Sequence, residues 1–483
     1  YARAETELHP IDGGTLAKGG GLSLALTGTV PMHLEDGQAV SRWRMESGEK
    51  ASFKAGTSGE SGSCARQDLI PCDLPSTERS LQETKDFWRG WLDVDETGRR
   101  IDYGRFRDMV ERSQLLLKLL FFQAEGTIAA APTTSLPEVI GGVRNWDYRY
   151  TWIRDTSLTL QALFNTGHLS EVERFLGWIN RIIMEEGAER MQIMYGLRGE
   201  RELPETTLSH LDGYKGSRPV RAGNAAFEQK QMDIYGELME AALKLSDYVG
   251  KIRAEQWPAL RQICDYVVSH WREPDYGIWE VRGGPRHFVY SKVMCWVALD
   301  RGLTIARRYG FDADTDLWER MRSTIHAEVC EKGYSTEKEA FVQHYDTDAL
   351  DASALLIPML GFLPFEDRRV VSTVDAVQRD LTRNGLVHRY FSEDGFEGEE
   401  GAFLLCSFWM VTCLTSLGRA EEAEALLHKL ECCANPLGLF AEEYDTNWCE
   451  ALGNFPQAFT HIGFINSVTH LLRARERYNP EER

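Results

Sequence analysis

The chain has little positive charge for its length and lacks the run of apolar residues that a membrane requires. Among its 483 residues, 54 Lys and Arg stand against 74 Asp and Glu, which gives a net charge of −20. Such a chain repels nucleic acids and anionic membranes, so we expect neither as a partner. No stretch of 18 apolar residues occurs, which excludes a transmembrane helix by sequence.

The sequence also lacks the short motifs of metal, nucleotide and thiol chemistry. Its 12 His include no H-E-x-x-H spacing, and no Walker A, G-x-S-x-G or strand-linked G-x-G-x-x-G motif occurs. None of its 10 Cys form a C-x-x-C pair, and Cys295 and Cys406 lie inside apolar runs typical of buried thiols. We therefore expect no catalytic metal and no cofactor. The first residues resemble neither an initiator Met nor a signal peptide, and a cytoplasmic location is the expectation.

Residues 1–100 follow a pattern of short apolar runs and turn residues. The segment 13–30, G-G-T-L-A-K-G-G-G-L-S-L-A-L-T-G-T-V, places glycines around β-type runs, and 42–56 continues the alternation. This pattern predicts an N-terminal antiparallel β-sandwich domain at 1–100, whose completeness the sequence leaves open.

From Tyr103 onward the apolar residues recur at helical spacing. Paired helices separated by long Gly-, Pro- and aromatic-rich loops are typical of an α/α toroid, in which each hairpin is buried against its neighbours. We therefore expect a mainly α domain at 101–483, including the helix that links it to the sandwich. The expected helices are 156–166, 170–184, 231–245, 254–271, 291–309, 318–330, 402–417 and 420–430.

One segment combines an unusual density of aromatic and charged side chains. Arg144–Asp155, R-N-W-D-Y-R-Y-T-W-I-R-D, holds two Trp, two Tyr, three Arg and two Asp. The faces of a pyranose ring stack on indole and phenol rings, and its hydroxyls bond to charged groups. The segment therefore favours a sugar site, although a core stripe with a surface Arg–Asp pair would use the same residue types.

Two further segments carry carboxyl groups in aromatic surroundings. Glu280 follows Trp279 in a Gly-rich turn, where contact with an indole would favour the neutral acid. Glu442 and Glu443 lie in a loop before an apolar segment. Glycoside hydrolysis requires two carboxyls with opposite roles, so Glu280 and Glu442 become the candidate pair. Taken alone, Glu280 is better explained as an exposed loop residue beside a packing Trp, and charge runs such as that at Glu442 are usually solvated.

Other segments contain polar residues that indicate a site less specifically. The sequences N-G-L-V-H-R-Y and E-G-E-E-G-A-F offer Arg389, Glu399 and Glu400 on loops. Asn224 opens a helical segment, where a polar helix cap is its expected role.

Taken together, the segments over about residues 80 to 475 resemble glycoside hydrolase family 15, the glucoamylase, glucodextranase and bacterial trehalase-like group. The matching blocks are G-G-V-R-N-W-D-Y-R-Y-T-W-I-R-D, P-V-R-A-G-N-A-A, Q-M-D-I-Y-G-E, G-I-W-E, E-G-A-F-L-L-C-S-F-W, A-E-E-Y-D and L-G-N-F-P-Q-A-F-T-H. The resemblance implies an (α/α)6 barrel preceded by a β-sandwich. It also implies exo-acting hydrolysis of an α-glucoside, with inversion, from the non-reducing end.

The resemblance also assigns residue roles. It implies that Glu280 is the general acid and Glu442 the general base. It implies that Trp152, Arg154 and Asp155 grip the terminal glucose. The remaining expected substrate-binding residues are Tyr148, Trp279, Arg389 and Glu443.

One departure bears on the substrate. Fungal glucoamylases place a second Glu after the acid to bind the next sugar, whereas Val281 stands here. The substrate is expected to be a small oligosaccharide or an α-glucan, and trehalose, isomaltose and dextran all stay open. Two other classes also remain: a sugar-binding relative without turnover, and a phosphorylase or epimerase on a similar toroid.

Overall fold

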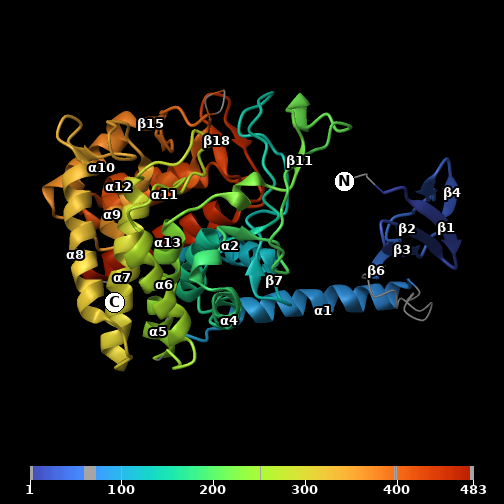
Figure 1. The fold of residues 1–483 in the computed structure, drawn as a ribbon. Helices are drawn as coiled ribbons and strands as arrows, with labels where there is room; N and C mark the ends of the chain where they lie inside the picture. Colours follow the sequence, from blue (N-terminus) through green and yellow to red (C-terminus); the bar gives the residue numbers. More distant parts are fainter. Residues whose placement is uncertain are drawn as a thin grey trace. The chain divides into compact units, whose positions relative to one another are not determined.

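The computed structural model describes residues 4–58, 72–98, 101–250, 252–395, 398 and 400–478. The chain divides into two compact units, Tyr1–Asp93 and Val94–Arg483 (Figure 1). The division follows Asp93, slightly before the boundary at residue 100 that the change of pattern predicts. Residues 99, 100 and 479–483 of the expected domains, like 59–71 of the expected sandwich, lie outside the described residues.

The first unit contains a four-stranded antiparallel sheet in the order β1–β2–β3–β6. A two-residue turn, Gly20–Gly21, joins β2 to β3 with φ values of +57° and +79°, which glycine adopts without steric cost. A hairpin of β4 and β5 contacts β1 and β2. The strands span Glu7–Ile11 (β1), Gly14–Gly19 (β2), Leu22–Gly28 (β3), His33–Glu35 (β4), Gln38–Val40 (β5) and Phe53–Ser58 (β6).

A long helix, α1 (Leu74–Asp93), lies where the sequence pattern predicts only strands and turns. That expectation is wrong for this segment. Asp73 begins the helix by accepting a hydrogen bond from the Ser76 amide at 2.7 Å, a capping interaction that the sequence could have indicated. The helix buries none of its residues within the described unit, so it lacks the apolar stripe on which helical periodicity relies.

In the second unit, helices α2 to α13 of the described residues alternate between an outer and an inner layer. The inner helices pack side by side in the closed order α3, α5, α7, α9, α11, α13 and back to α3. This ring confirms the expected (α/α)6 barrel. The inner helices are Ile153–Asn165 (α3), Asp233–Val249 (α5), Val289–Tyr309 (α7), Leu356–Met359 (α9), Leu404–Ser416 (α11) and Ala458–Tyr478 (α13).

The outer helices run antiparallel to the inner ones and cover them, as α8 covers α7 in Figure 1. They are Arg107–Leu120 (α2), Ser170–Glu186 (α4), Trp257–His270 (α6), Thr315–Lys332 (α8), Arg368–Asp380 (α10) and Ala420–Glu431 (α12). The two layers differ in sequence. Inner α11 is buried from Leu404 to Thr415, whereas outer α10 buries one stripe that includes Val370, Val374 and Val377.

The connections leading into the inner helices hold most of the irregular chain. Because each outer helix returns the chain, the six inner helices begin at the same end of the barrel. Short strands brace these connections and other turns: Phe121–Phe122 (β7), Thr127–Ile128 (β8), Thr151–Trp152 (β9), Met194–Tyr195 (β10), Thr206–Thr207 (β11), Arg221–Ala222 (β12), Tyr334–Ser335 (β13), Ala340–Phe341 (β14), Thr382–Arg383 (β15), Leu386–Val387 (β16), Ala402–Phe403 (β17), Glu443–Asp445 (β18) and Glu450–Leu452 (β19).

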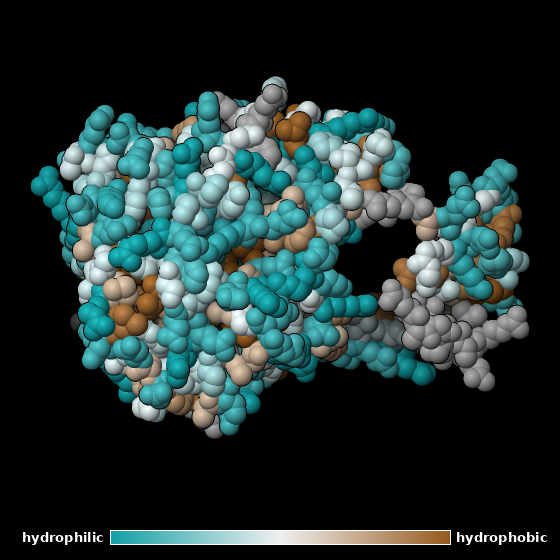
Figure 2. All heavy atoms as spheres, in the orientation of Figure 1, coloured by the Kyte–Doolittle hydropathy of each residue, from teal (hydrophilic) through white to brown (hydrophobic). Residues whose placement is uncertain are grey.

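The surface agrees with the acidic composition. The face of the helical unit in Figure 2 is mostly hydrophilic, with small separate hydrophobic areas. Among the helices of the described residues, none joins the length to the apolar character needed to cross a bilayer.

A close approach between two inner helices gives a test of the ring. Gly236 of α5 packs on α7, and a Cβ there would lie 2.3 Å from the Met294 carbonyl oxygen. We expect Gly236→Ala to lower the free energy of unfolding by about 1–3 kcal/mol, because the two backbones must separate. Gly177→Ala is the control, since a Cβ on this α4 residue meets nothing within 4 Å and should be neutral or stabilising. Urea unfolding of both variants measures the difference, and equal effects would contradict the packing argument.

Candidate active site

One cavity at the N-terminal ends of the inner helices brings together the expected site residues other than Glu443. It encloses about 400 Å³, counted out to its open mouth. Its lining is Ala130, Tyr148, Trp152, Arg154, Asp155, Ile278, Trp279, Glu280, Arg389, Phe403, Glu442, Gln457 and Phe459. These residues come from the connections into α3, α7, α11 and α13, which explains how segments far apart in sequence form one site.

The two candidate carboxyls come from opposite sides of the barrel. Glu280 precedes α7, and Glu442 precedes α13. In the ring order of inner helices, α7 and α13 are three positions apart in either direction. A ligand in the cavity would therefore have one carboxyl contributed from each side.

Glu442 is buried and held by a tyrosine. Its side chain is 2% exposed, and the Tyr148 hydroxyl donates to its Oε1 at 2.7 Å. Burial raises the pKa of Glu442 to about 7, against the opposing effects of the Arg389 charge and the Tyr148 hydrogen bond. A carboxyl with this pKa exchanges protons near neutral pH.

Glu280 occupies a constrained backbone position. Its φ is +59°, in the left-handed region that costs a non-glycine residue about 1–3 kcal/mol. The Trp152 indole N–H donates to Glu280 Oε1 at 2.7 Å, and Arg154 Nη1 lies 3.4 Å from the same oxygen. These donors direct the carboxyl to the cavity, and backbone strain of this kind is common at functional sites.

Trp279 is placed differently from the expectation that it shields Glu280. Its indole N–H donates to both carboxylate oxygens of Asp351, at 2.9 and 3.0 Å. Its ring packs against Phe403, while Trp152 is the indole that contacts Glu280. The left-handed conformation of Glu280 turns the two neighbouring side chains toward different partners.

Arg154 and Asp155 form a buried ion pair at the beginning of α3. Arg154 Nε donates to Asp155 Oδ1 at 3.1 Å, and Nη1 donates to the Ile278 carbonyl. The guanidinium also lies 5.0 Å from the centre of the Phe459 ring. Burial raises the pKa of Asp155 to about 7 although the Arg154 charge lowers it. The pair therefore offers donors and acceptors to hydroxyls in a site that excludes most water.

Glu443 points away from the cavity, because successive side chains in β18 lie on opposite faces. Its Oε2 accepts a hydrogen bond from the Gly401 amide at 3.0 Å, and its Oε1 lies 3.6 Å from Arg389 Nη2. Glu443 therefore helps to hold Arg389 in place. Its side chain does not line the cavity, so it would not contact a ligand bound there.

Arg389 lies in a cluster of three carboxyls, of which those of Glu138 and Glu443 are buried and that of Glu400 is partly buried. It donates from Nε to Glu400 at 2.9 Å, and its Nη2 lies 3.6 Å from Glu138 and from Glu443. Burial raises the pKa of Glu138 and of Glu443 well above the ordinary value. Oxygens of the three carboxyls lie within 4.8 Å of one another, and the guanidinium supplies the positive charge at this position.

Sequence reasoning did not identify Glu138, Asp351 or Gly453 as parts of the site. Glu138 and Asp351 gave no signal, because a lone acidic residue does not reveal its burial. Gly453 lies in the L-G-N-F-P-Q block. A glycine in this block could have indicated a position where the backbone lies close to another group. Asn224 caps its helix as expected by accepting the Ala226 amide at 3.0 Å, while Glu399 lies outside the described residues.

The chain matches a known protein family. The profile of the glycosyl hydrolases family 15 matches residues 104–429. The chain belongs to this family. It is therefore a glycoside hydrolase, as its sequence blocks predicted.

The curated relatives include trehalases. The chain is 40% identical over 482 residues to "Trehalase" of Mycobacterium tuberculosis, covering 98% of this chain and 67% of that protein. It is 39% identical over 395 residues to "Trehalase" of Thermoplasma volcanium, covering 82% of this chain and 62% of that protein. The chain thus spans about two thirds of the length of these relatives.

Among solved structures, a bacterial glucoamylase complexed with acarbose superposes with a TM-score of 0.75 at 11% identity. The superposition covers 98% of this chain and 75% of the other. At this identity the likeness supports the fold alone.

Gly453 provides a test of the Glu442 position. A Cβ at this residue, which has a φ of +74°, would lie 2.6 Å from Glu442 Oε2. We expect Gly453→Ala to displace the carboxyl and lower glycosidase turnover at least tenfold in a folded protein. Gly418→Ala is the matched control, because Gly418 has a φ of +75° and nothing within 4 Å of its Cβ position. Equal turnover in the two variants would contradict the placement of Glu442.

Proposed function

We propose that the chain is an inverting, exo-acting α-glucoside hydrolase whose substrate is α,α-trehalose. The observation that carries the reaction is the pair Glu280 and Glu442, which line one cavity from opposite sides of the barrel. The substrate is supported by relatives named trehalase, which match this chain at about 40% identity over most of its length.

In the proposed mechanism, Glu280 donates a proton to the glycosidic oxygen as the bond to the anomeric carbon breaks. Glu442 removes a proton from the water that attacks the opposite face of the sugar. The proton from Glu280 ends on the hydroxyl of the departing sugar, and the proton from water ends on the Glu442 carboxyl. This geometry predicts a separation of roughly 6.5–9.5 Å between the two carboxyls.

The first glucose is proposed to bind between Trp152, Arg154 and Asp155. The Arg154–Asp155 pair meets the sugar hydroxyls, and the Trp152 ring lies beside Tyr148 with centroids 5.4 Å apart. Phe459 backs the guanidinium of Arg154. A closed end of this kind admits only the end of a chain, which accounts for exo action.

Other α-glucosides could be cleaved by the same mechanism, but the relatives that are named for them are less similar to this chain than the trehalases are. "Isomaltose glucohydrolase" of Kribbella flavida is 28% identical over 63% of this chain, compared with 40% over 98% for the mycobacterial trehalase. A sugar-binding protein without turnover is disfavoured because both carboxyls are present. A phosphorylase is disfavoured because Glu442 occupies the position where a cationic phosphate site would be needed. Relative rates on trehalose, isomaltose, maltose and dextran separate these possibilities.

We further propose that the chain acts in the cytoplasm on a neutral sugar, without a nucleic acid or membrane partner. The net charge of −20 supports the absence of nucleic-acid and anionic-membrane partners. A neutral disaccharide would enter the acidic site without electrostatic repulsion.

The stereochemistry of the first product tests the mechanism. Inverting cleavage of trehalose releases one β-glucose from the attacked ring and one α-glucose from the departing ring, so proton NMR should detect equal amounts at early times. Two α-glucose molecules would contradict inversion. Glu280→Gln and Glu442→Gln should each lower kcat by about 10²–10⁴. Glu421→Gln, on the exposed side of α12, is the control that should retain turnover.

The pH profile tests the role of Glu442. Because burial raises the pKa of Glu442 to about 7, a base that must be ionised should lose kcat/KM as the pH falls through 7. Tyr148→Phe removes a hydrogen bond to the carboxylate, so the acidic limb should move up by about 1–2 pH units. Tyr334→Phe, which loses a hydrogen bond to Ser372, is the control. An unmoved limb in Tyr148→Phe would argue that another group controls it.

A further inference from the structure

A second chamber adjoins the cavity that contains the carboxyl pair. It encloses about 440 Å³ to its mouth, and it shares Tyr148, Trp279, Glu280 and Arg389 with the first chamber. Its remaining lining is Glu138, Arg144, Trp146, Asn224, Ala226, Arg282, Tyr390 and Asp394. Since Glu280 lines both chambers, the proposed function places the oxygen that it would protonate at their junction and the departing sugar in the second chamber.

We propose that Trp146, Glu205, Arg221 and Arg282 form a fixed wall that ends the second chamber after one sugar ring. This inference rests on the proposed function, because it places the departing glucose of a disaccharide. It assigns chain-length selectivity to four residues outside the catalytic pair. We refer to these four residues as the outer wall.

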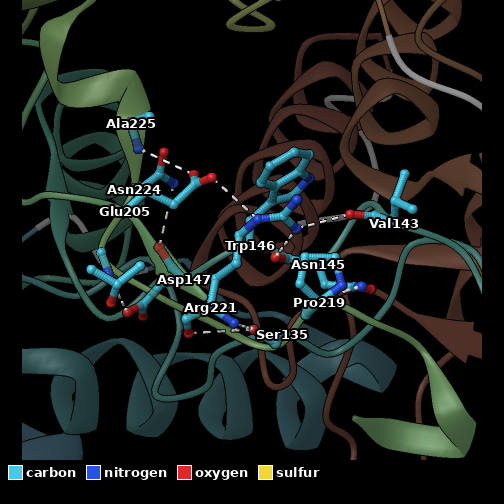
Figure 3. Close-up of polar contacts among 12 residues, drawn as sticks. Ser135, Val143, Asn145, Trp146, Asp147, Glu205, Pro219, Arg221, Asn224 and Ala225 are labelled. Atoms are coloured by element: carbon cyan, nitrogen blue, oxygen red, sulfur yellow. Dashed lines mark hydrogen bonds and ion pairs between the residues drawn. The ribbon is translucent and has the colours of Figure 1, made fainter. Parts of the chain in front are cut away.

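The outer wall is built around the Trp146 indole. The Arg221 guanidinium lies 4.6 Å from the ring centre and that of Arg282 lies 5.5 Å from it. Glu205 joins the two cations, at 3.2 Å from Arg221 Nε and 3.3 Å from Arg282 Nη2. Figure 3 shows Arg221 beside Trp146, with Glu205 on the adjoining segment. Two guanidinium groups tied by one carboxylate thus support a single aromatic ring.

Hydrogen bonds fix the wall to the rest of the site. Arg221 Nη1 donates to the carbonyls of Val143 and Asn145 at 2.8 and 2.9 Å (Figure 3). The Trp146 carbonyl accepts from the Ser135 amide at 2.8 Å and from Asn454 Nδ2 at 2.9 Å. Because the wall is braced from both its backbone and its guanidinium groups, opening it requires several of these bonds to break together.

The chemistry of the wall suits the second ring of a neutral disaccharide. An indole presents an apolar face to the C–H bonds of a pyranose, and a guanidinium donates to its hydroxyls. Arg282 lies two residues after Glu280 in the chain, and both residues line the second chamber. The departing sugar therefore meets a fixed donor and an aromatic ring on this side.

Trehalose extended by one α-1,4-linked glucose tests the outer wall. With the unmodified ring in the first chamber, cleavage of the 1,1 bond yields glucose and maltose, and the added ring must pass the wall. We expect wild-type kcat/KM for this maltose-releasing cleavage to be at least 100-fold below that for trehalose. In Trp146→Ala the ratio of extended substrate to trehalose should rise at least tenfold. Glu205→Gln should raise the ratio in the same direction while retaining the shape of the side chain.

Trp448→Ala is the matched control, because the Trp448 side chain is 82% exposed and the variant should keep the wild-type ratio. α-Glucosyl fluoride, which has no second ring, reports on the first chamber alone. Wild-type cleavage of the extended substrate at a rate like that of trehalose, or unchanged ratios in both wall variants, would overturn the proposal.

Failure of the proposed function has a different signature. If the wild-type protein hydrolyses neither trehalose nor α-glucosyl fluoride, the glucosidase assignment fails. If it hydrolyses the fluoride and maltose but not trehalose, the trehalase assignment fails alone. In that case the outer wall predicts strong preference for maltose over maltotriose, and equal rates on the two would overturn it.

Discussion

The buried guanidinium of Arg389 is the interaction on which the geometry of the site depends. It contacts Glu138, Glu400 and Glu443, which come from three separate connecting segments of the barrel. These segments have little regular structure, so side-chain bonds must hold them. A guanidinium has five donors and suits this task. Removing it would leave buried carboxyls without a counter-charge, which is strongly destabilising. Because Glu442 precedes Glu443 in the chain, the position of the proposed base depends on the same cluster.

The carboxyls around Arg389, of which Glu400 also pairs with Arg144, set the electrostatics of the cavity. Burial disfavours the ionised form of Glu442, while the Arg389 charge favours it, and the pKa of Glu442 settles at about 7. Asp155 follows the same balance with Arg154. Glu280 is half-buried whereas Glu442 is buried, and in the proposed mechanism Glu280 lies nearer the departing sugar. The proposed mechanism requires such different surroundings, because two chemically identical side chains must take different parts in one reaction.

The sequence predicted the features that local pattern controls. Helical spacing located most of the barrel helices, because inner helices such as α11 are buried along nearly their whole length, while an outer helix such as α10 carries one apolar stripe. It missed α1, whose residues are all outside the core, and gave no separate prediction for α9, α10 and α13. Residue types and spacing also pointed to the cavity residues, since few other roles need Trp, Arg and Asp together.

The directions in which the site side chains point could not be predicted from the sequence. The alternation of β18 turns Glu443 from the cavity, and the left-handed φ of Glu280 separates it from Trp279. The burial of Glu138 depends on Arg389, a partner far along the chain. Long-range contacts and single dihedral angles leave no local periodic signal, so they could not be derived from one sequence.

In the proposed site, the residues that activate water and the residues that select the departing sugar come from different connections of the barrel. The proposed base and the cluster that holds it come mainly from the connections into α11 and α13, together with Glu138. The outer wall comes instead from the connections into α3, α5 and α7, which supply Trp146, Arg221 and Arg282. Glu280, the proposed acid, precedes α7 and lines the second chamber together with Trp146 and Arg282. Substitutions in the wall would thus alter which sugar departs while the water-activating side keeps its bonds, so one barrel can serve several α-glucosides through changes in a few loops.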